Sequence, residues 1–157
     1  MTSSYDWCKR AAFAIAVVGF GTGVALATQE VAPANPAAKR SVLDGVYTDE
    51  QARRGEVQYG RTCEMCHGSD LSGNEIEEVP ALVWDAFLTN WSGRTVKDFV
   101  DSISRSMPRD KPGSLSARAY TDVAAYILQA NKFPSGSREL DRDPKVLEQI
   151  LIERSKK

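Results

Sequence analysis

The chain has 157 residues, which is enough for one domain and too few for two of ordinary size. A content of 42% hydrophobic and 26% charged residues is typical of a globular protein, and the net charge of −1 provides no basic field for binding nucleic acid. The only histidine is His67, which excludes every metal or catalytic site that requires two histidines.

The N-terminus has the pattern of a secretory signal peptide over residues 1–27. Lys9 and Arg10 precede an apolar run over 11–27, which ends in a small-x-small sequence at Ala27. The alternative is an uncleaved membrane anchor, but this run has only 17 residues, including three glycines, and a bilayer span needs about 20. We therefore expect cleavage after Ala27 and a periplasmic protein, bound to a membrane only if the signal is retained.

The remaining chain predicts helices joined by loops and no run of buried strands. Residues 28–44, with two prolines, are expected to form a loose arm. A capping-box pattern, Thr48 with Gln51, opens the first helix. The predicted helices in chain order are about 49–61, 81–90, one capped by Thr95 that ends before Met107, one capped by Ser116 that ends near Asn131, and a short one that begins at Asp143-Pro144.

The first long helix leads into Cys63-Glu64-Met65-Cys66-His67, the C-x-x-C-H signature of c-type haem attachment. Two thiols at this spacing can each bond one haem vinyl group, and the following imidazole can then bind the iron. A thioredoxin-like site would need an α/β context, and structural zinc would need four ligands. Cys8 is expected to leave with the signal, so a plain disulfide of Cys63 with Cys66 is the remaining alternative. The signature favours haem.

A haem iron held by one histidine has a sixth position, for which methionine is a common ligand. Met1 is expected to leave with the signal, and Met65 lies within the attachment loop, where its side chain cannot reach the opposite face. Met107 remains, in a loop beside Pro108. A lone methionine is ordinarily core filler. Elimination and the loop setting indicate that Met107 is the second metal ligand, with His67 the first.

From Val46 to Leu140 the sequence resembles the class I cytochrome c family of small bacterial monohaem proteins. The resemblance implies an all-α fold, a small cytochrome c fold with about four to five helices around one covalently attached haem c. The domain would cover 45–140, followed by a C-terminal extension over 141–157 with a short helix. Gly55 and Tyr59 match a glycine and an aromatic that pack in this family on a C-terminal helix, here against Tyr126.

The same resemblance implies further cofactor-binding residues. Pro80-Ala81-Leu82 matches the family's P-x-L segment, so that the Pro80 carbonyl would accept a hydrogen bond from His67 and Leu82 would pack on the haem; a plain turn is the alternative. Trp91 and Arg94 are in place to donate to the haem propionates, although a core tryptophan and a surface arginine are equally ordinary.

The implied function is single-electron transfer between a donor dehydrogenase and an acceptor oxidase or cytochrome. The segment Val123–Leu128, with Asn131, Pro134 and Gly136 after it, also resembles cytochromes that accompany quinoprotein alcohol dehydrogenases, so a subunit of such a complex is an alternative. A haem enzyme such as a peroxidase, or a gas sensor, would need an open iron site. Arg105, Arg109 and Lys111 flank Met107 and could form a basic docking surface for an acidic partner; ordinary solvated loop charges are the alternative.

Overall fold

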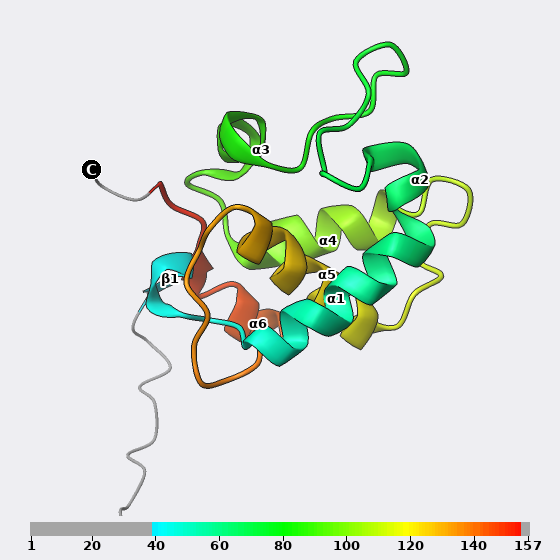
Figure 1. Cartoon of the computed structure of the whole chain (residues 1–157). Helices are drawn as coiled ribbons and strands as arrows, with labels where there is room; N and C mark the ends of the chain where they lie inside the picture. The colour runs from blue at the N-terminus through cyan, green and yellow to red at the C-terminus, as the bar shows by residue number, and fades with distance from the viewer. Residues whose placement is uncertain (1–38, 155–157) are drawn as a thin grey trace, which may run out of the picture. The chain divides into compact units, whose positions relative to one another are not determined.

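The computed structural model describes residues 39–154, and its architecture is helical, as the sequence predicts. Four substantial helices, α1, α3, α4 and α5, form the framework of the domain (Figure 1). The elements in chain order are β1 Arg40–Ser41, a 3-10 turn Val42–Asp44, α1 Asp49–Thr62, α2 Glu64–His67, α3 Trp84–Trp91, α4 Val96–Ser106, α5 Ala117–Ala130, α6 Pro144–Leu147 and β2 Ile150–Leu151.

The long helices begin at the residues whose side chains cap them. Thr95 accepts a hydrogen bond from the backbone of Asp98, whose carboxylate accepts one in return from the Thr95 amide. Ser116 caps α5 through a single bond, in which its side chain accepts from the Ala119 amide. The capping box predicted at Thr48 is only half formed. Thr48 accepts from the Gln51 amide, but the Gln51 side chain is buried and exchanges two hydrogen bonds with the backbone of Leu140.

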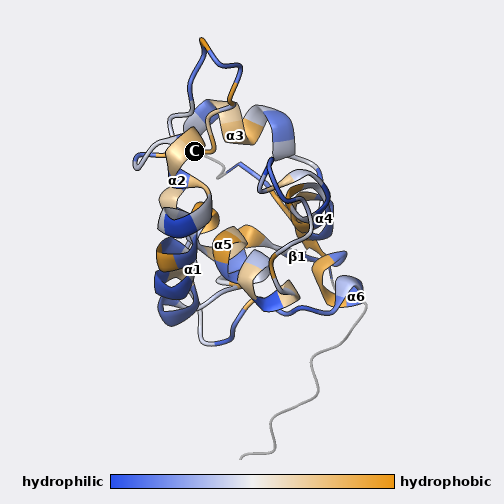
Figure 2. Cartoon of the chain, turned by 90° about the vertical axis from the view of Figure 1, so that its right-hand side faces the viewer, coloured by the Kyte–Doolittle hydropathy of each residue, from blue (hydrophilic) through white to orange (hydrophobic). Residues whose placement is uncertain are grey.

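The closest crossing of two helices joins α1 to α5. At Gly55 a Cβ atom would lie 1.9 Å from the backbone oxygen of Asp122, so only glycine allows this approach. One turn further along, the rings of Tyr59 and Tyr126 lie 5.3 Å apart and fill the angle between the helices. Figure 2 shows α5 in the interior, with hydrophobic residues along it, and α1 with a hydrophilic outer side. The crossing predicted from the sequence is therefore present.

The two ends of the described chain are part of the core, which corrects the predicted boundaries. Residues 40–44 were expected in a loose arm, yet β1 pairs in parallel with β2 and Val42 is fully buried. The extension beyond 140 contains the predicted short helix, but it also buries Ile150 and Ile152. Ile152 exchanges backbone hydrogen bonds with Gly93 and Arg94 between α3 and α4. Apolar side chains at both ends therefore close the domain.

The predicted signal peptide over 1–27, Cys8 within it, and the first part of the predicted arm lie outside the described residues. Between residues 39 and 154, none of the helices has the length and apolar character needed to cross a bilayer.

The crossing of α1 and α5 predicts a large difference between two glycines of the same helix. Gly55→Ala should lower the free energy of unfolding by about 3 kcal/mol, because the added methyl overlaps backbone that cannot move aside. Gly60→Ala is the matched control: its Cβ would meet only the flexible Glu64 side chain, and alanine favours helix by up to about 1 kcal/mol. Denaturant unfolding of both variants measures this, and equal stabilities would contradict the packing.

Candidate haem-binding site

The C-x-x-C-H signature lies where α1 ends and a single further turn begins. Cys63 is the C-cap of α1 and the N-cap of α2, and its amide donates to the Tyr59 carbonyl at 2.8 Å. His67 closes α2 and donates from its amide to the Cys63 carbonyl at 2.9 Å. Gly68 follows with φ +77°, a left-handed conformation that suits glycine and turns the chain away. The two cysteines and the histidine are therefore presented on one turn.

The two thiols are separate and differ in environment. Cys63 and Cys66 are both free cysteines, so the disulfide alternative finds no support among the described residues. Cys63 is half-buried, and burial raises the pKa of its thiol, whereas Cys66 is exposed. Both thiols are available for covalent attachment of a ligand.

The imidazole of His67 is buried and held through one nitrogen. Its Nδ1 lies 3.0 Å from the carbonyl oxygen of Pro80, the contact that the family resemblance implies. Because a carbonyl only accepts, Nδ1 carries the proton and Nε2 presents its lone pair. Burial lowers the pKa of His67, which keeps the ring neutral as metal ligation requires. Nε2 makes no hydrogen bond to any residue between 39 and 154.

Pro80 reaches His67 because the intervening loop folds back on itself. Asn74 and Val79 exchange backbone hydrogen bonds at the base of a hairpin, and the Leu82 amide donates to the Leu71 carbonyl at 2.8 Å. The hairpin passes close to Gly73, where a Cβ atom would lie 2.4 Å from the Val79 oxygen. On the other side, the Tyr59 hydroxyl donates to the Gly68 carbonyl at 2.7 Å. The residues on both sides of His67 are therefore fixed.

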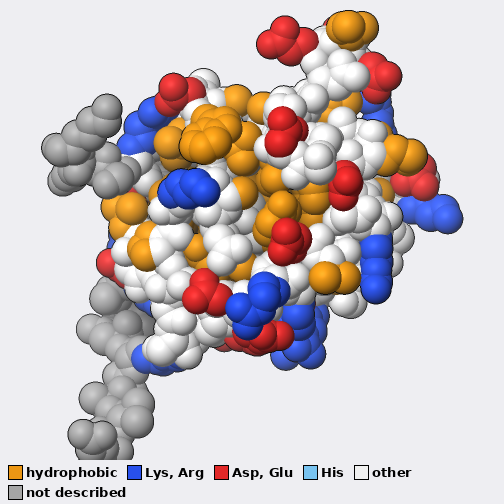
Figure 3. All heavy atoms as spheres, in the orientation of Figure 1, with side chains coloured by type: hydrophobic (Ala, Val, Ile, Leu, Met, Phe, Trp, Pro, Cys, Tyr) orange, Lys and Arg blue, Asp and Glu red, His pale blue; other side chains and the backbone are white. Residues whose placement is uncertain are grey.

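Several apolar side chains of the domain are only partly buried. They pack against the core from segment 80–83, α3, α4 and the end of α5, and are Leu82, Leu88, Trp91, Val100, Ile103 and Ala130. Figure 3 shows hydrophobic side chains gathered on one face around α3 and between α3 and α1. Partly covered apolar side chains, a buried imidazole with one hydrogen bond, and two free thiols form a donor set that fits a flat apolar group attached to the chain. The residues present thus fit a covalently bound haem.

Met107 begins the loop after α4, at the place the sequence predicts. Its backbone carbonyl accepts a hydrogen bond from the Tyr120 hydroxyl at 2.7 Å, which ties this loop to α5. The side chain is half-buried, whereas that of Met65 is 96% exposed. Met107 is accordingly the methionine that is packed into the domain. Nothing in the sequence around Tyr120 indicates this distant partner of its hydroxyl.

Trp91 and Arg94 lie together where α3 ends. The guanidinium of Arg94 stacks over the Trp91 ring at 4.7 Å from its centroid, and the same ring packs edge-on against Phe99 at 4.9 Å. The indole N–H of Trp91 makes no hydrogen bond to a described residue, and Arg94 is exposed. Both groups therefore have donors available for an anionic substituent. No hydrogen bond joins either of them to His67 or Met107.

A polar contact that sequence reasoning missed lies just after α5. Asn131 was expected only to mark the end of that helix, yet its side chain contacts the segment that carries Pro80 and Leu82. An asparagine at a helix end is too common for its sequence position alone to indicate this role.

Comparison with protein families gives one match. The family model described as cytochrome C oxidase, cbb3-type, subunit III matches residues 50–127, a range that contains the signature, Pro80, Met107 and most of α1 and α5. No curated protein matches the chain, and no solved structure does.

The hydroxyl of Tyr59 predicts a measurable difference from that of Tyr126. Tyr59→Phe should lower the free energy of unfolding by about 1 kcal/mol, because the Gly68 carbonyl loses its donor while the ring stays in place. Tyr126→Phe keeps the ring pair and removes a hydroxyl that bonds no described residue, so its stability should stay within about 0.5 kcal/mol. Urea unfolding measures both. Equal losses would show that the bond to Gly68 contributes nothing.

Proposed function

We propose that this chain, whose residues 50–127 form a cytochrome c domain, is an exported single-electron carrier with one haem c ligated by His67 and Met107. A cytochrome c domain implies electron transfer and a covalently attached haem. The observation that carries the proposal is the buried imidazole of His67, held at Nδ1 by Pro80, with Nε2 unbonded to any described residue and a thiol on either end of the same turn.

Each residue of the site has a separate role in this proposal. Cys63 and Cys66 would hold the cofactor through thioether bonds, so that it could not dissociate outside the cytoplasm. When bound, the haem supplies a metal centre that gains and loses one electron. The Pro80 carbonyl keeps the proton of His67 on Nδ1 and makes the ring a stronger donor. The apolar walls exclude water, which favours the less charged reduced state.

Met107 is the best candidate for the second ligand among the chain's methionines. Met65 is almost fully exposed on the outer side of α2, and Met1 lies in the predicted signal. The Tyr120 bond to the Met107 carbonyl fixes the loop that presents the thioether. Ligation by both His67 and Met107 would leave the metal no open position for a substrate, which favours an electron carrier over a peroxidase or a sensor.

For partners, we propose a dehydrogenase as donor and an oxidase or another cytochrome as acceptor. The matching family takes its description from an oxidase subunit, which supports an oxidase as acceptor. The resemblance of Val123–Leu128 and the residues after it to cytochromes of quinoprotein alcohol dehydrogenases supports such a donor, or membership in its complex. Co-purification from the native host distinguishes a free carrier from a subunit.

The proposed docking surface consists of Arg105, Arg109 and Lys111, around Met107. All three side chains are exposed, and none forms a salt bridge with another residue in 39–154. Unpaired cations at an exposed loop attract an acidic partner over distances of about 10 Å at ordinary salt.

Ligation by Met107 predicts opposite outcomes for two methionines. Met107→Ala should abolish the near-infrared methionine–iron band of the oxidised protein and lower the reduction potential by on the order of 0.1 V, because axial ligands tune haem potentials across about 0.8 V. Met65→Ala removes an exposed side chain and should leave both unchanged. Spectroscopy and redox titration of the two haem-loaded variants give the answer. An unchanged band in Met107→Ala would refute this ligand.

The docking surface predicts a dependence on ionic strength. Replacing Arg109 and Lys111 together by Gln should slow electron transfer to an acidic redox partner about tenfold at low salt and have little effect at 0.5 M salt, because steering is screened there. The matched control replaces two exposed cations of the C-terminal extension, Arg142 and Lys145, by Gln. Stopped-flow rates that do not depend on salt in the native protein would contradict electrostatic docking.

A further inference from the structure

We propose that Asn131 is a positioning residue for the axial histidine: it holds segment 80–84 against the end of α5, and thereby holds the Pro80 carbonyl on His67. This inference rests on the proposed function, in which His67 binds the iron. Asn131 itself touches neither His67 nor, in the proposal, the cofactor.

The side chain of Asn131 joins two parts of the chain that are far apart in sequence. Its Nδ2 donates to the Leu82 carbonyl at 2.9 Å and to the Ile127 carbonyl at 2.8 Å, within α5. Its Oδ1 accepts from the Trp84 amide at 2.9 Å. Both ends of one amide therefore bind the segment that leads into α3, while the third contact orients that amide on α5.

These bonds complete the fixation of the residues that follow Pro80. Leu82 is bonded on both sides of its backbone, because its amide donates to Leu71 and its carbonyl accepts from Asn131. Pro80 lies two residues earlier, and its carbonyl oxygen is 3.0 Å from Nδ1 of His67. Two residues leave little slack, so a displacement of Leu82 displaces the Pro80 carbonyl as well. The position of the imidazole therefore depends on the amide of Asn131.

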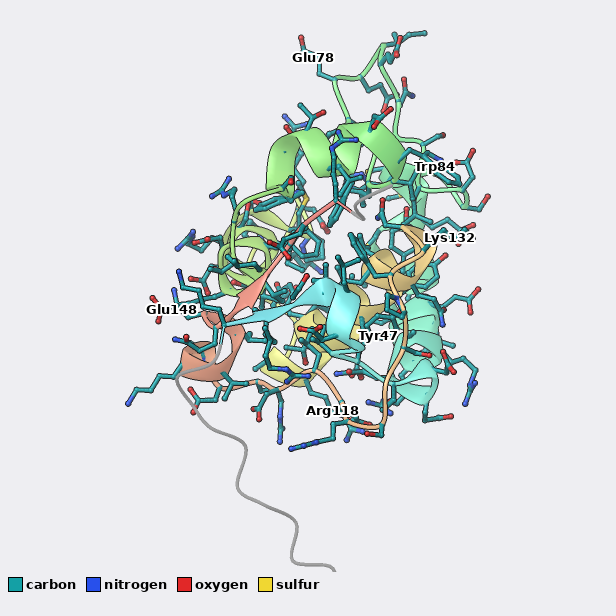
Figure 4. All side chains as sticks on the ribbon, turned by 90° about the vertical axis from the view of Figure 1, so that its left-hand side faces the viewer. Tyr47, Glu78, Trp84, Arg118, Lys132 and Glu148 are labelled. Atoms are coloured by element: carbon teal, nitrogen blue, oxygen red, sulfur yellow. The ribbon has the colours of Figure 1, made fainter. Side chains whose placement is uncertain are left out.

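Trp84 shows that the segment is held against a conformational cost. Its φ of +60° is left-handed, which costs a bulky residue about 1–2 kcal/mol. Its side chain is 64% exposed, so burial of the indole offsets little of that cost. In Figure 4, Trp84 and Lys132, the neighbour of Asn131, lie on the same side of the molecule. The Asn131 bond to the Trp84 amide is the contact that favours this backbone conformation.

Loss of the Asn131 hydrogen bonds to Leu82 and Trp84 should change the reduction potential in a definite direction. A carbonyl bonded to Nδ1–H makes imidazole a stronger electron donor, which stabilises oxidised iron and lowers the potential. A looser Pro80 weakens that bond, so the reduction potential should rise. This is the reverse of the change expected for Met107→Ala.

The test compares Asn131→Ala with Gln129→Ala in the haem-loaded full chain. Gln129 is the matched control, since its amide donates to Asp49 at 3.2 Å from the same end of α5 but does not contact segment 80–84. For Asn131→Ala we expect a raised potential and about tenfold faster exchange of the His67 Nδ1 proton by NMR, the change that loss of one net hydrogen bond produces. Gln129→Ala should match the native protein in both. Native values in a folded, haem-loaded Asn131→Ala would overturn the proposal.

A second variant separates positioning from simple capping of α5, and replaces the first if Asn131→Ala does not fold. In this variant Asn131→Ala is combined with Trp84→Gly. Glycine adopts φ +60° without strain, so the segment can keep its conformation without the hydrogen bonds of Asn131. The proposal predicts that potential and proton exchange return most of the way to native values. A folded double variant without that return would overturn it. Two other results would instead refute the proposed function. One is a native protein without haem, and the other is a Met107→Ala variant that keeps the methionine–iron band.

Discussion

The close approach of α1 to α5 at Gly55 determines where everything at the end of α1 lies. With no side chain between the backbones, α1 rests directly on α5, and the Tyr59–Tyr126 pair fixes the angle one turn later. The signature begins only four residues after Tyr59, so the thiols and the imidazole take their position from this crossing. The Tyr59 hydroxyl extends the same constraint to Gly68, immediately beyond His67.

The loop after His67 returns to this fixed turn and places the Pro80 carbonyl on the imidazole. The loop after α4 carries Met107, the proposed second ligand, and its backbone carbonyl is tied to α5 by Tyr120. Asn131 connects the first of these loops to the far end of the same helix. Helix α5 therefore supports α1 directly and, through two side chains, both loops. In the proposed function, this common support would let residues from distant parts of the chain hold one cofactor.

The helices were predictable because their signals are local. Thr95 and Ser116 cap helices at the expected residues, and the apolar spacing defines the faces that are buried. The attachment signature is also local, since its five residues lie on one turn. The His67–Pro80 contact was reached only through the family resemblance, because nothing in the intervening residues determines how their loop folds back.

The contacts that the sequence did not reveal are long-range. Gln51 reads as half of a capping box, yet its side chain binds Leu140, and the cost of burying an unpaired amide makes that distant partner decisive. Residues 40–44 read as an arm because their partner strand is about 110 residues further along the chain. Asn131 bonds Trp84 and Leu82, which precede it in the chain by 47 and 49 residues. No local pattern identifies such pairs.

The proposed function requires that the polypeptide carry one haem through two thioethers at Cys63 and Cys66. The most direct measurement is the intact mass of the purified exported protein, made in cells with a competent haem-attachment system, together with its visible spectrum. The account predicts a coloured protein whose mass exceeds that of the processed chain by one haem, retained after denaturation. A colourless protein with the mass of the bare chain would contradict it.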